Sequence, residues 1–186
     1  MPEGHTLHRL ALDLNRLCGS SAGYQLSAGS VSRSPSLDGA TLTQAFAIGK
    51  HLFLRLDRGL VHIHLGLFGR FRRSKPGLAP KASVRLRLLG KERAWDLVGP
   101  TCCEDQSEEQ FSALKARLGA DPLGDQLRSR TVTARIRRSK RPIAALLLDQ
   151  SLFSGIGNVY RAELSRTWSL VPCPAARTHF AVCASS

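Results

Sequence analysis

Short apolar runs, broken by glycine, proline and serine, dominate the chain from about residue 20 to residue 99 and limit what it can fold into. Three of these runs begin at Lys50, Leu60 and Val84. Runs of this kind, bounded by turn residues, are typical of β-strands. Gly59 separates the first two and predicts a hairpin, because glycine tolerates the positive φ that tight turns need. We therefore expect an antiparallel β-sandwich or barrel.

Helical spacing of apolar residues appears on both sides of this strand-rich region. Before it, leucine and alanine recur at helical intervals and predict an amphipathic helix over about residues 5–18. After it, a helix is expected around Glu108–Leu118, ended by Gly119 and Pro122. The fold class is therefore α+β, with a domain boundary at the end of this second helix.

The second half predicts two helices joined by a sharp break. Pro142 suits a first helical position, and the apolar run after it extends to Gln150. Gly155 and Gly157 interrupt the pattern, and Asn158 can cap a further helix. The two glycines would let a phosphate approach the free N–H groups at that helix's N-terminus. An ordinary αα-hairpin in a protein core is the alternative.

The net charge indicates the kind of partner. The sequence has 27 Lys+Arg and 14 Asp+Glu, a formal charge of +13, so a polyanion is the obvious partner. No apolar run approaches the roughly 18 residues of a membrane span, and the start does not resemble a secretory signal, so we expect a cytoplasmic protein. Cationic residues are densest just before the predicted helix pair, at Arg135, Arg137, Arg138, Lys140 and Arg141.

The cysteines do not have the spacing of a disulfide framework or of a C-x2-C metal site, so we expect reduced thiols. Beyond Arg166 the helical periodicity fades, and a disordered tail is the simplest interpretation. The five cysteines are Cys18, Cys102, Cys103, Cys173 and Cys183.

Pro2 and Glu3 are the first candidates for chemistry. Removal of Met1 would expose the secondary amine of Pro2, a nucleophile that can attack an aldehyde-like sugar carbon and form an iminium. Glu3 could protonate a sugar ring oxygen, which is general acid catalysis. The alternative is that Met-Pro-Glu begins the chain for no chemical reason.

A glycine-bracketed turn after the second apolar run carries two large apolar residues. Leu67 and Phe68 would suit wedges that unstack DNA bases, although a pair of core residues at a hairpin corner is the alternative. Lys50 could neutralise a phosphate or simply be solvated. His62 and His64 alternate on one strand face and favour phosphate contact or packing over a metal site, because no third ligand lies nearby.

Four motifs occur together in the order and approximate spacing of one enzyme family. With them the chain resembles the formamidopyrimidine-DNA glycosylase/endonuclease VIII family, in particular its endonuclease VIII-like branch, over about residues 1–164. The resemblance implies an N-terminal β-sandwich with a flanking helix, followed by a helical domain that contains a helix-two-turn-helix. The motifs are Pro2-Glu3-Gly4, Gly49-Lys50, the turn from His64 to Gly69, and the segment from Leu148 to Tyr160.

The resemblance also implies roles for individual residues. Pro2 would be the Schiff-base nucleophile at the deoxyribose C1′, Glu3 the acid that opens the sugar, and Lys50 a third catalytic residue that holds a phosphate near the lesion. The DNA-binding residues would be Asn158 and His64 at phosphates, Leu67 and Phe68 in the gap left by a flipped nucleotide, and Arg141.

The function implied is that of a bifunctional DNA glycosylase and AP lyase of base-excision repair. Such an enzyme removes oxidised bases, here with pyrimidines favoured, and nicks the strand by β,δ-elimination. Its partner would be double-stranded DNA with oxidised-base or abasic lesions, bound by a monomer. The expected domains are a catalytic sandwich over residues 1–118, a helical DNA-binding domain over 119–166 and an atypical tail over 167–186.

The sequence departs from the family near its end. Family members continue with more helices and a zinc finger or a metal-free counterpart, whereas this sequence stops at Ser186 without a C-x2-C pair. We therefore expect a truncated product without zinc or another cofactor. The alternative function is a weak or inactive DNA-binding remnant, since losing one phosphate clamp could remove about 2–4 kcal/mol of transition-state stabilisation. RNA or ribosome binding would explain the charge but none of the motifs.

Overall fold

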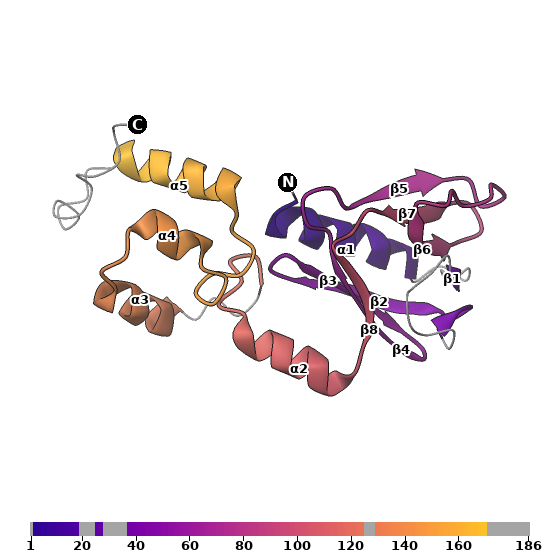
Figure 1. The fold of residues 1–186 in the computed structure, drawn as a ribbon, viewed down its shortest axis with the longest axis horizontal. Helices are drawn as coiled ribbons and strands as arrows, with labels where there is room; N and C mark the ends of the chain where they lie inside the picture. Colours follow the sequence, from indigo (N-terminus) through magenta and orange to yellow (C-terminus); the bar gives the residue numbers. More distant parts are fainter. Residues whose placement is uncertain (1, 19–24, 28–36, 125–128, 171–186) are drawn as a thin grey trace.

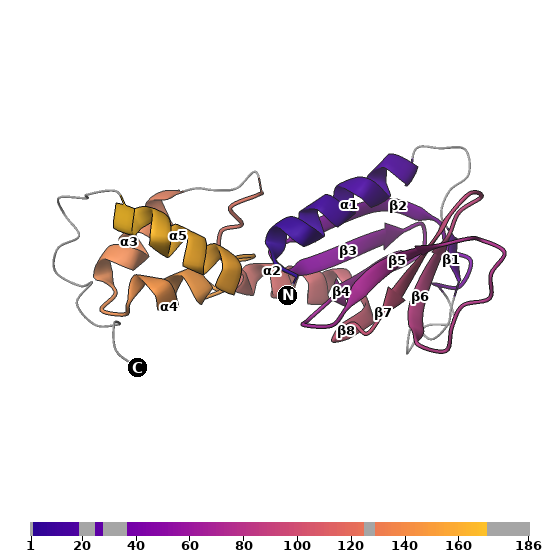
Figure 2. The same ribbon diagram turned by 90° about the horizontal axis from the view of Figure 1, so that it is seen from above.

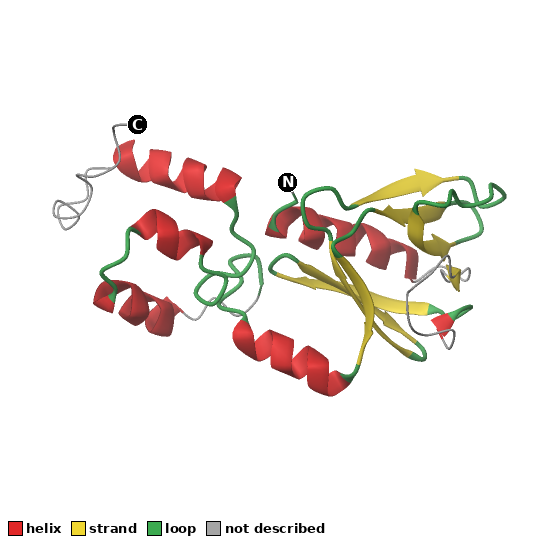
Figure 3. Cartoon of the chain, in the orientation of Figure 1, coloured by secondary structure: helices red, strands yellow, loops and turns green. Residues whose placement is uncertain are grey.

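Strands gather at one end of the molecule and three helices at the other (Figure 1, Figure 3). The computed structural model describes residues 2–18, 25–27, 37–124 and 129–170. The helix α2 leads from the strand-rich end to the helical end, and in both ribbon views the N-terminus lies at the junction between them (Figure 1, Figure 2). The two parts of the predicted site, the N-terminal residues and the segment that leads into the helical end, therefore meet at this junction.

The strands form two four-stranded antiparallel sheets, which confirms the expected sandwich. One has the order β1-β6-β7-β5 and the other the order β2-β3-β4-β8. The hairpin predicted at Gly59 joins β3 to β4, with Leu56 paired to Gly59. The strands are β1 (Gln25–Ser27), β2 (Leu42–Ile48), β3 (His51–Leu56), β4 (Gly59–His64), β5 (Arg70–Ser74), β6 (Val84–Leu89), β7 (Ala94–Val98) and β8 (Cys102–Gln106).

The helices expected from the sequence are present, with one addition. The basic run before Pro142 is itself helical as α3, and α5 continues four residues past Arg166, the expected end of regular structure. No helix in the described ranges is long and apolar enough to cross a membrane. The helices are α1 (Gly4–Cys18), α2 (Glu108–Arg117), α3 (Ser129–Arg138), α4 (Ile143–Leu148) and α5 (Asn158–Leu170). The rest of the expected tail, residues 171–186, lies outside the described residues.

The main core lies between the two sheets and is closed by α1. Leu14 of α1 is fully buried there with Leu52, Leu54, Leu86 and Leu97 from the strands. Each leucine taken out of water in this way stabilises the fold by about 1.5–3 kcal/mol before entropy costs are counted. This core fixes the ends of α1 and β3, from which the candidate site is built.

A second apolar cluster lies on the outer face of the β2-β3-β4-β8 sheet. Phe53 and Leu60 point outward from it and pack against Leu114 of α2. Because this sheet is covered on both faces, its central strands carry continuous apolar runs instead of strict alternation. Ser107 is the N-cap of α2 and forms a capping box. Its side chain accepts from the N–H of Gln110, and the Gln110 side chain accepts from the N–H of Ser107.

Candidate functional site

Glu3 connects the N-terminus of the chain to the start of α5. Its side chain is buried, with the residue 1% exposed. The N–H of Val159 donates to Oε1 at 2.8 Å, and the N–H groups of Gly157 and Tyr160 donate to Oε2 at 3.1 and 3.3 Å. N–H groups in the first turn of a helix have no partner within the helix and carry partial positive charge. The Glu3 carboxylate therefore caps α5.

This contact corrects the expectation that the N-terminus of α5 offers its N–H groups to a phosphate. Three N–H groups at this helix end already donate to the Glu3 carboxylate of the same chain, so they are not available to a phosphate. Gly157 makes the contact possible, since a Cβ there would lie 2.4 Å from Oε1 of Glu3. The side chain of Asn158 is exposed at this helix end and is not part of the cap.

Three glycines from distant parts of the sequence pack backbone on backbone beside this cap. The N–H of Gly4 donates to the carbonyl oxygen of Gly155 at 2.9 Å. A Cβ at Gly49 would lie 2.9 Å from the nitrogen of Gly155, and one at Gly4 would lie 3.0 Å from its Cα. Gly155 has a φ of 102°, which L side chains rarely adopt. We call Gly4, Gly49 and Gly155 the glycine junction; it brings three of the four sequence motifs together.

The glycine junction places Lys50 near Glu3. Lys50 follows Gly49 in the turn between β2 and β3 and is half-buried. Burial lowers the pKa of its ammonium group, while attraction to the Glu3 carboxylate acts in the opposite direction. A positive charge that is partly desolvated and close to a carboxylate is a suitable phosphate ligand beside the N-terminus. Pro2 directly precedes Glu3 and is half-buried at the same junction.

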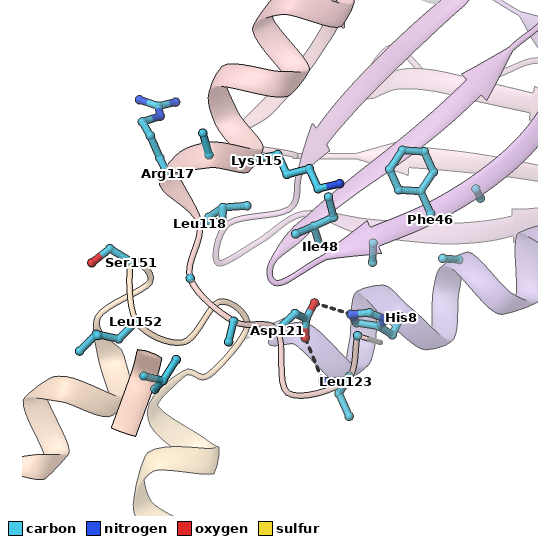
Figure 4. A pocket seen from close by; sticks show the side chains of 18 of the residues that line it. His8, Phe46, Ile48, Lys115, Arg117, Leu118, Asp121, Leu123, Ser151 and Leu152 are labelled. Carbon is cyan, nitrogen blue, oxygen red and sulfur yellow. Dashed lines mark hydrogen bonds and ion pairs between the residues drawn. The ribbon is translucent and has the colours of Figure 1, made fainter. Parts of the chain in front are cut away.

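Asp121 holds the turn that carries Lys50, and sequence reasoning missed it. Its Oδ2 accepts from the N–H of Gly49 at 2.6 Å and pairs with Nε2 of His8 at 2.8 Å, while its Oδ1 accepts from the N–H of Leu123 at 3.0 Å. Figure 4 shows this carboxylate directed from the segment after α2 toward His8 of α1. Asp121 is a positioning residue: it ties Lys50 to α1 through backbone and ring contacts. An aspartate after a helix end gives no sequence signal for such a long-range role.

A cavity of about 1030 Å³ lies beside Asp121. Its walls come from α1, β2, the end of α2 and α3, and the apolar side chains of Phe46, Ile48 and Leu118 line it with Lys115 (Figure 4). Pro2, Glu3 and Lys50 are not among its lining residues. The cavity therefore adjoins the candidate site at Asp121 but does not include these three residues.

The turn after β4 exposes the two apolar residues that the sequence singled out. Leu67 is 62% exposed and Phe68 is 79% exposed, so they are not core residues at a hairpin corner. The turn is anchored by buried Leu65, whose carbonyl oxygen accepts from the N–H of Gly69 at 2.9 Å. Gly66, with a φ of 64°, packs against the Thr101 side chain. Two large apolar side chains are thus held in solvent by a rigid turn.

The two histidines of β4 have different environments. His62 is 7% exposed and its ring stacks on Phe53 at 5.1 Å, which favours packing over phosphate contact. It also bonds to His51, which the sequence analysis did not single out. His64 is half-buried at the strand end; burial and, to a lesser degree, Lys50 lower the pKa of its ring. Among the described residues, no group of three or more His, Cys, Asp or Glu could hold a metal ion.

Two arginines of the basic run make contacts within the helical end of the molecule. Nη1 of Arg141 lies 2.7 Å from Oδ2 of Asp149, and Nη1 of Arg135 donates to the carbonyl oxygen of Ser151 at 2.9 Å. Hydrogen bonds from Ser151 and then Arg141 keep the pKa of the Asp149 carboxyl below its usual range. Arg141 remains more than half exposed, so its guanidinium can still meet an anion.

The fold is similar to that of formamidopyrimidine-DNA glycosylase. A solved structure of formamidopyrimidine-DNA glycosylase from Lactococcus lactis, in complex with DNA containing an oxidised pyrimidine, has a TM-score of 0.72 at 20% identity and covers 88% of this chain and 66% of that one. Another structure of the Lactococcus lactis protein, bound non-covalently to DNA with an AP site, has a TM-score of 0.70 at 19% identity, covering 85% and 66%. At this identity the likeness establishes the fold.

Sequence comparison establishes the family. Residues 1–99 match the formamidopyrimidine-DNA glycosylase N-terminal domain, and residues 118–178 match the formamidopyrimidine-DNA glycosylase H2TH domain. Endonuclease 8 1 of Mycobacterium tuberculosis is 45% identical over 172 residues, which are 88% of this chain and 64% of that protein. The chain belongs to the formamidopyrimidine-DNA glycosylase/endonuclease VIII family. It spans less than two thirds of the length of this relative.

Proposed function

We propose that this chain acts on DNA as a glycosylase and AP lyase of base-excision repair, with Pro2 as nucleophile. The observation that carries the proposal is the capping of α5 by Glu3, which fixes the N-terminus beside Lys50 and the helix-two-turn-helix. The names of the relatives, endonuclease 8 and formamidopyrimidine-DNA glycosylase, support the same reaction class.

Pro2 supplies the covalent step once Met1 is removed. The lone pair of its nitrogen attacks C1′ of the damaged nucleotide, and the C1′–base bond breaks with its electrons leaving on the base. Loss of the Pro2 proton gives a neutral aminal. The C1′–O4′ bond then breaks as O4′ takes a proton from Glu3, which opens the sugar ring and leaves an iminium between the nitrogen and C1′. Removal of a proton from C2′ expels the 3′ phosphate, and a second elimination expels the 5′ phosphate. Water finally hydrolyses the imine and releases Pro2.

Glu3 and Lys50 serve this reaction from fixed positions. Glu3 exchanges the proton that opens the sugar ring, and its three N–H partners hold the carboxyl group in one orientation. Lys50 binds the phosphate next to the lesion and offsets its negative charge. His64, Asn158 and Arg141 bind further phosphates.

The exposed Leu67 and Phe68 act as wedges in the DNA stack. Extruding a nucleotide costs a few kcal/mol and is easiest at damaged pairs, and apolar side chains that fill the gap offset part of this cost. The partner is double-stranded DNA with oxidised-base or abasic lesions, oxidised pyrimidines being preferred, and the chain binds it as a monomer without a cofactor. We place this activity in the cytoplasm, on the nucleoid.

Borohydride trapping tests the proposal. The chain is incubated with a duplex that contains one abasic site, and borohydride reduces any iminium to a stable amine. We expect a covalent protein–DNA adduct with the abasic duplex and none with the undamaged duplex. Binding without an adduct would instead support the DNA-binding remnant, and intact mass measurement establishes beforehand whether Met1 has been removed.

A further inference from the structure

A chain of polar contacts crosses the outer face of the β2-β3-β4-β8 sheet, close to Lys50. Nδ1 of His51 and Nε2 of His62 are 2.8 Å apart. The other nitrogen of His62, Nδ1, lies 3.4 Å from Nε2 of Gln106 and 3.6 Å from Sγ of Cys102. Four side chains from β3, β4 and β8 are thus connected, and the proposed mechanism uses none of them.

Gln106, at one end of these contacts, determines their direction. Its amide nitrogen can only donate, so it meets Nδ1 of His62 as an acceptor. Burial and then Glu104, to whose carboxylate the thiol donates, raise the pKa of Cys102. A neutral imidazole carries one proton, so His62 carries it on Nε2 and donates it to Nδ1 of His51. His51 in turn must carry its own proton on Nε2.

Both rings are neutral at physiological pH. Burial, above all, lowers the pKa of His51 to about 4, with further contributions from His62, His64, Arg117 and Lys50. Burial, followed by repulsion from His64, lowers the pKa of His62 to about 4. The surroundings of His51 are rich in cationic groups, so a neutral ring is the form that costs least there.

His51, the last side chain in this series of contacts, lies where the proposed function requires a phosphate. His51 directly follows Lys50, pairs with His64 across β3 and β4, and has its ring centroid 5.0 Å from that of His64. Its ring is half-buried and, among the described residues, makes no hydrogen bond other than the one to His62. The Nε2–H of His51 is therefore available to a ligand.

We propose that Gln106, acting through His62, fixes His51 as a neutral hydrogen-bond donor for a phosphate oxygen of bound DNA next to Lys50. The identity of the ligand rests on the proposed function. The tautomers of His51 and His62, in contrast, are a property of the protein without DNA. A neutral donor orients the phosphate without adding charge, and so complements Lys50, which binds by charge.

The tautomers are measured directly on the folded chain at pH 7. Long-range ¹H–¹⁵N correlation spectra of uniformly labelled protein distinguish Nδ1–H from Nε2–H rings. We expect the Nε2–H form for both His51 and His62. The Nδ1–H form for either ring would overturn the proposal; if both rings have it, the Gln106 amide is turned over, with its Oε1, which is buried without a partner, accepting instead.

Binding to a duplex with a tetrahydrofuran abasic analogue tests the donor itself. We expect His51→Phe to weaken binding about tenfold, the effect of losing one hydrogen bond to a charged group. The dependence of log K on log salt should be unchanged, because a neutral donor releases no counterion. Lys50→Gln should instead lower that slope by about 0.9. His51→Gln, which retains a neutral donor, should restore most of the affinity.

The outcomes separate the two proposals. If His51→Phe binds as well as the parent, or if it lowers the salt slope as Lys50→Gln does, His51 is not a neutral donor and the inference fails. If the parent protein does not bind the duplex, the proposed function fails. The tautomer spectra still decide the direction of the hydrogen bonds between Gln106, His62 and His51. Thermal melting of each variant shows that the comparison is made between folded proteins.

Discussion

The strand-rich end and the helical end of the molecule are stabilised by different interactions. The sandwich has a continuous apolar core to which both sheets and α1 contribute. At the helical end, the described residues after Leu118 include four buried hydrophobic side chains, and neither core cluster extends into them. Those four are Leu146, Leu147, Leu152 and Ile156.

Polar contacts take the place of a shared core between the two ends. The N–H groups of Gly119 and Ala120 donate to the carbonyl oxygens of Gln150 and Leu152 at 2.8 and 3.0 Å, and Glu3 caps α5 from the sandwich side. Glu3, which is proposed for chemistry, therefore also attaches the helical end. The comparison teaches that stability comes from an apolar core in the sandwich, whereas at the junction it depends on a residue of the candidate site.

The largest effect on stability is expected on the outer face of the β1-β6-β7-β5 sheet, at the buried pair of Arg87 and Asp96. Nε of Arg87 lies 2.6 Å from Oδ1 of Asp96, and the two side chains are 5% and 11% exposed. Arg87→Met leaves the Asp96 carboxylate without its main partner, and we expect the free energy of unfolding to fall by about 3–5 kcal/mol. Urea denaturation measures it. Arg70→Met, at an exposed arginine of β5 that pairs with Val98, is the control and should change it by less than about 0.5 kcal/mol.

The same pair makes this effect dependent on pH. The hydrogen bond from Arg87 keeps the pKa of Asp96 below its ordinary value, against the effect of burial. A carboxyl whose pKa is lower in the folded state stabilises the fold above its unfolded pKa of about 3.9 and loses this contribution as the pH falls further. The difference between parent and Arg87→Met should therefore shrink below about pH 4. A difference that grows in acid would contradict the assignment.

A smaller and local effect is expected at the junction. Glu3→Gln replaces the carboxylate that accepts three N–H groups by an amide with one acceptor oxygen, and we expect α5 to lose about 2 kcal/mol of protection. Hydrogen exchange should speed up at Val159 and Tyr160 while Leu52 in the sandwich is unaffected. Glu163→Gln, at an exposed carboxylate of the same helix, should change neither. Equal acceleration throughout the chain would show that the two ends share one cooperative core.

Asp121→Asn should loosen the connection between Lys50 and α1 by a somewhat smaller amount. The amide keeps one acceptor oxygen for three donors, so we expect a loss of about 1.5 kcal/mol, seen as faster exchange of the Gly49 amide proton. Asp13→Asn, at a half-buried aspartate of α1 that pairs with Arg16 and Arg73, serves as the matched control. Unchanged exchange at Gly49 would remove Asp121 from the positioning residues.

The smallest effect on stability is expected at the wedge. Because Leu67 and Phe68 are exposed, Leu67→Ala and Phe68→Ala should each change the free energy of unfolding by less than about 0.5 kcal/mol. Affinity for the abasic duplex should nevertheless fall, while Leu78→Ala, at a leucine that is 58% exposed elsewhere on the sandwich, should not affect it. Loss of stability without loss of affinity would assign the two side chains to packing.

The sequence predicted those parts of the fold that depend on local periodicity. The helix at residues 5–18 and the hairpin at Gly59 agree with the structure to within a residue or two, because apolar spacing determines which face of each element is buried. The strand β8 was missed, since its residues Cys102–Gln106 are mostly polar and it gains its place by pairing with β4. The helix α3 was missed because a run of arginines looks like a charged patch.

The candidate site was predicted in its members but not in its geometry. The motifs containing Glu3, Lys50 and Gly155 could be identified from their residues and order. That Glu3 would cap a helix 154 residues away could not, because a polar contact between distant segments has no period in the sequence. His51 and Asp121 were missed for the same reason. The roles of Pro2, Leu67 and Asn158 remain predictions.

The position of the covalent bond tests the central claim most directly. After borohydride trapping with an abasic duplex, the adduct is digested and the modified peptide is identified by mass spectrometry. We predict that the sugar remnant is attached to the nitrogen of Pro2, and that acetylating the N-terminus abolishes the adduct. Attachment to Lys50 or another lysine, or an adduct that survives acetylation, would contradict the account.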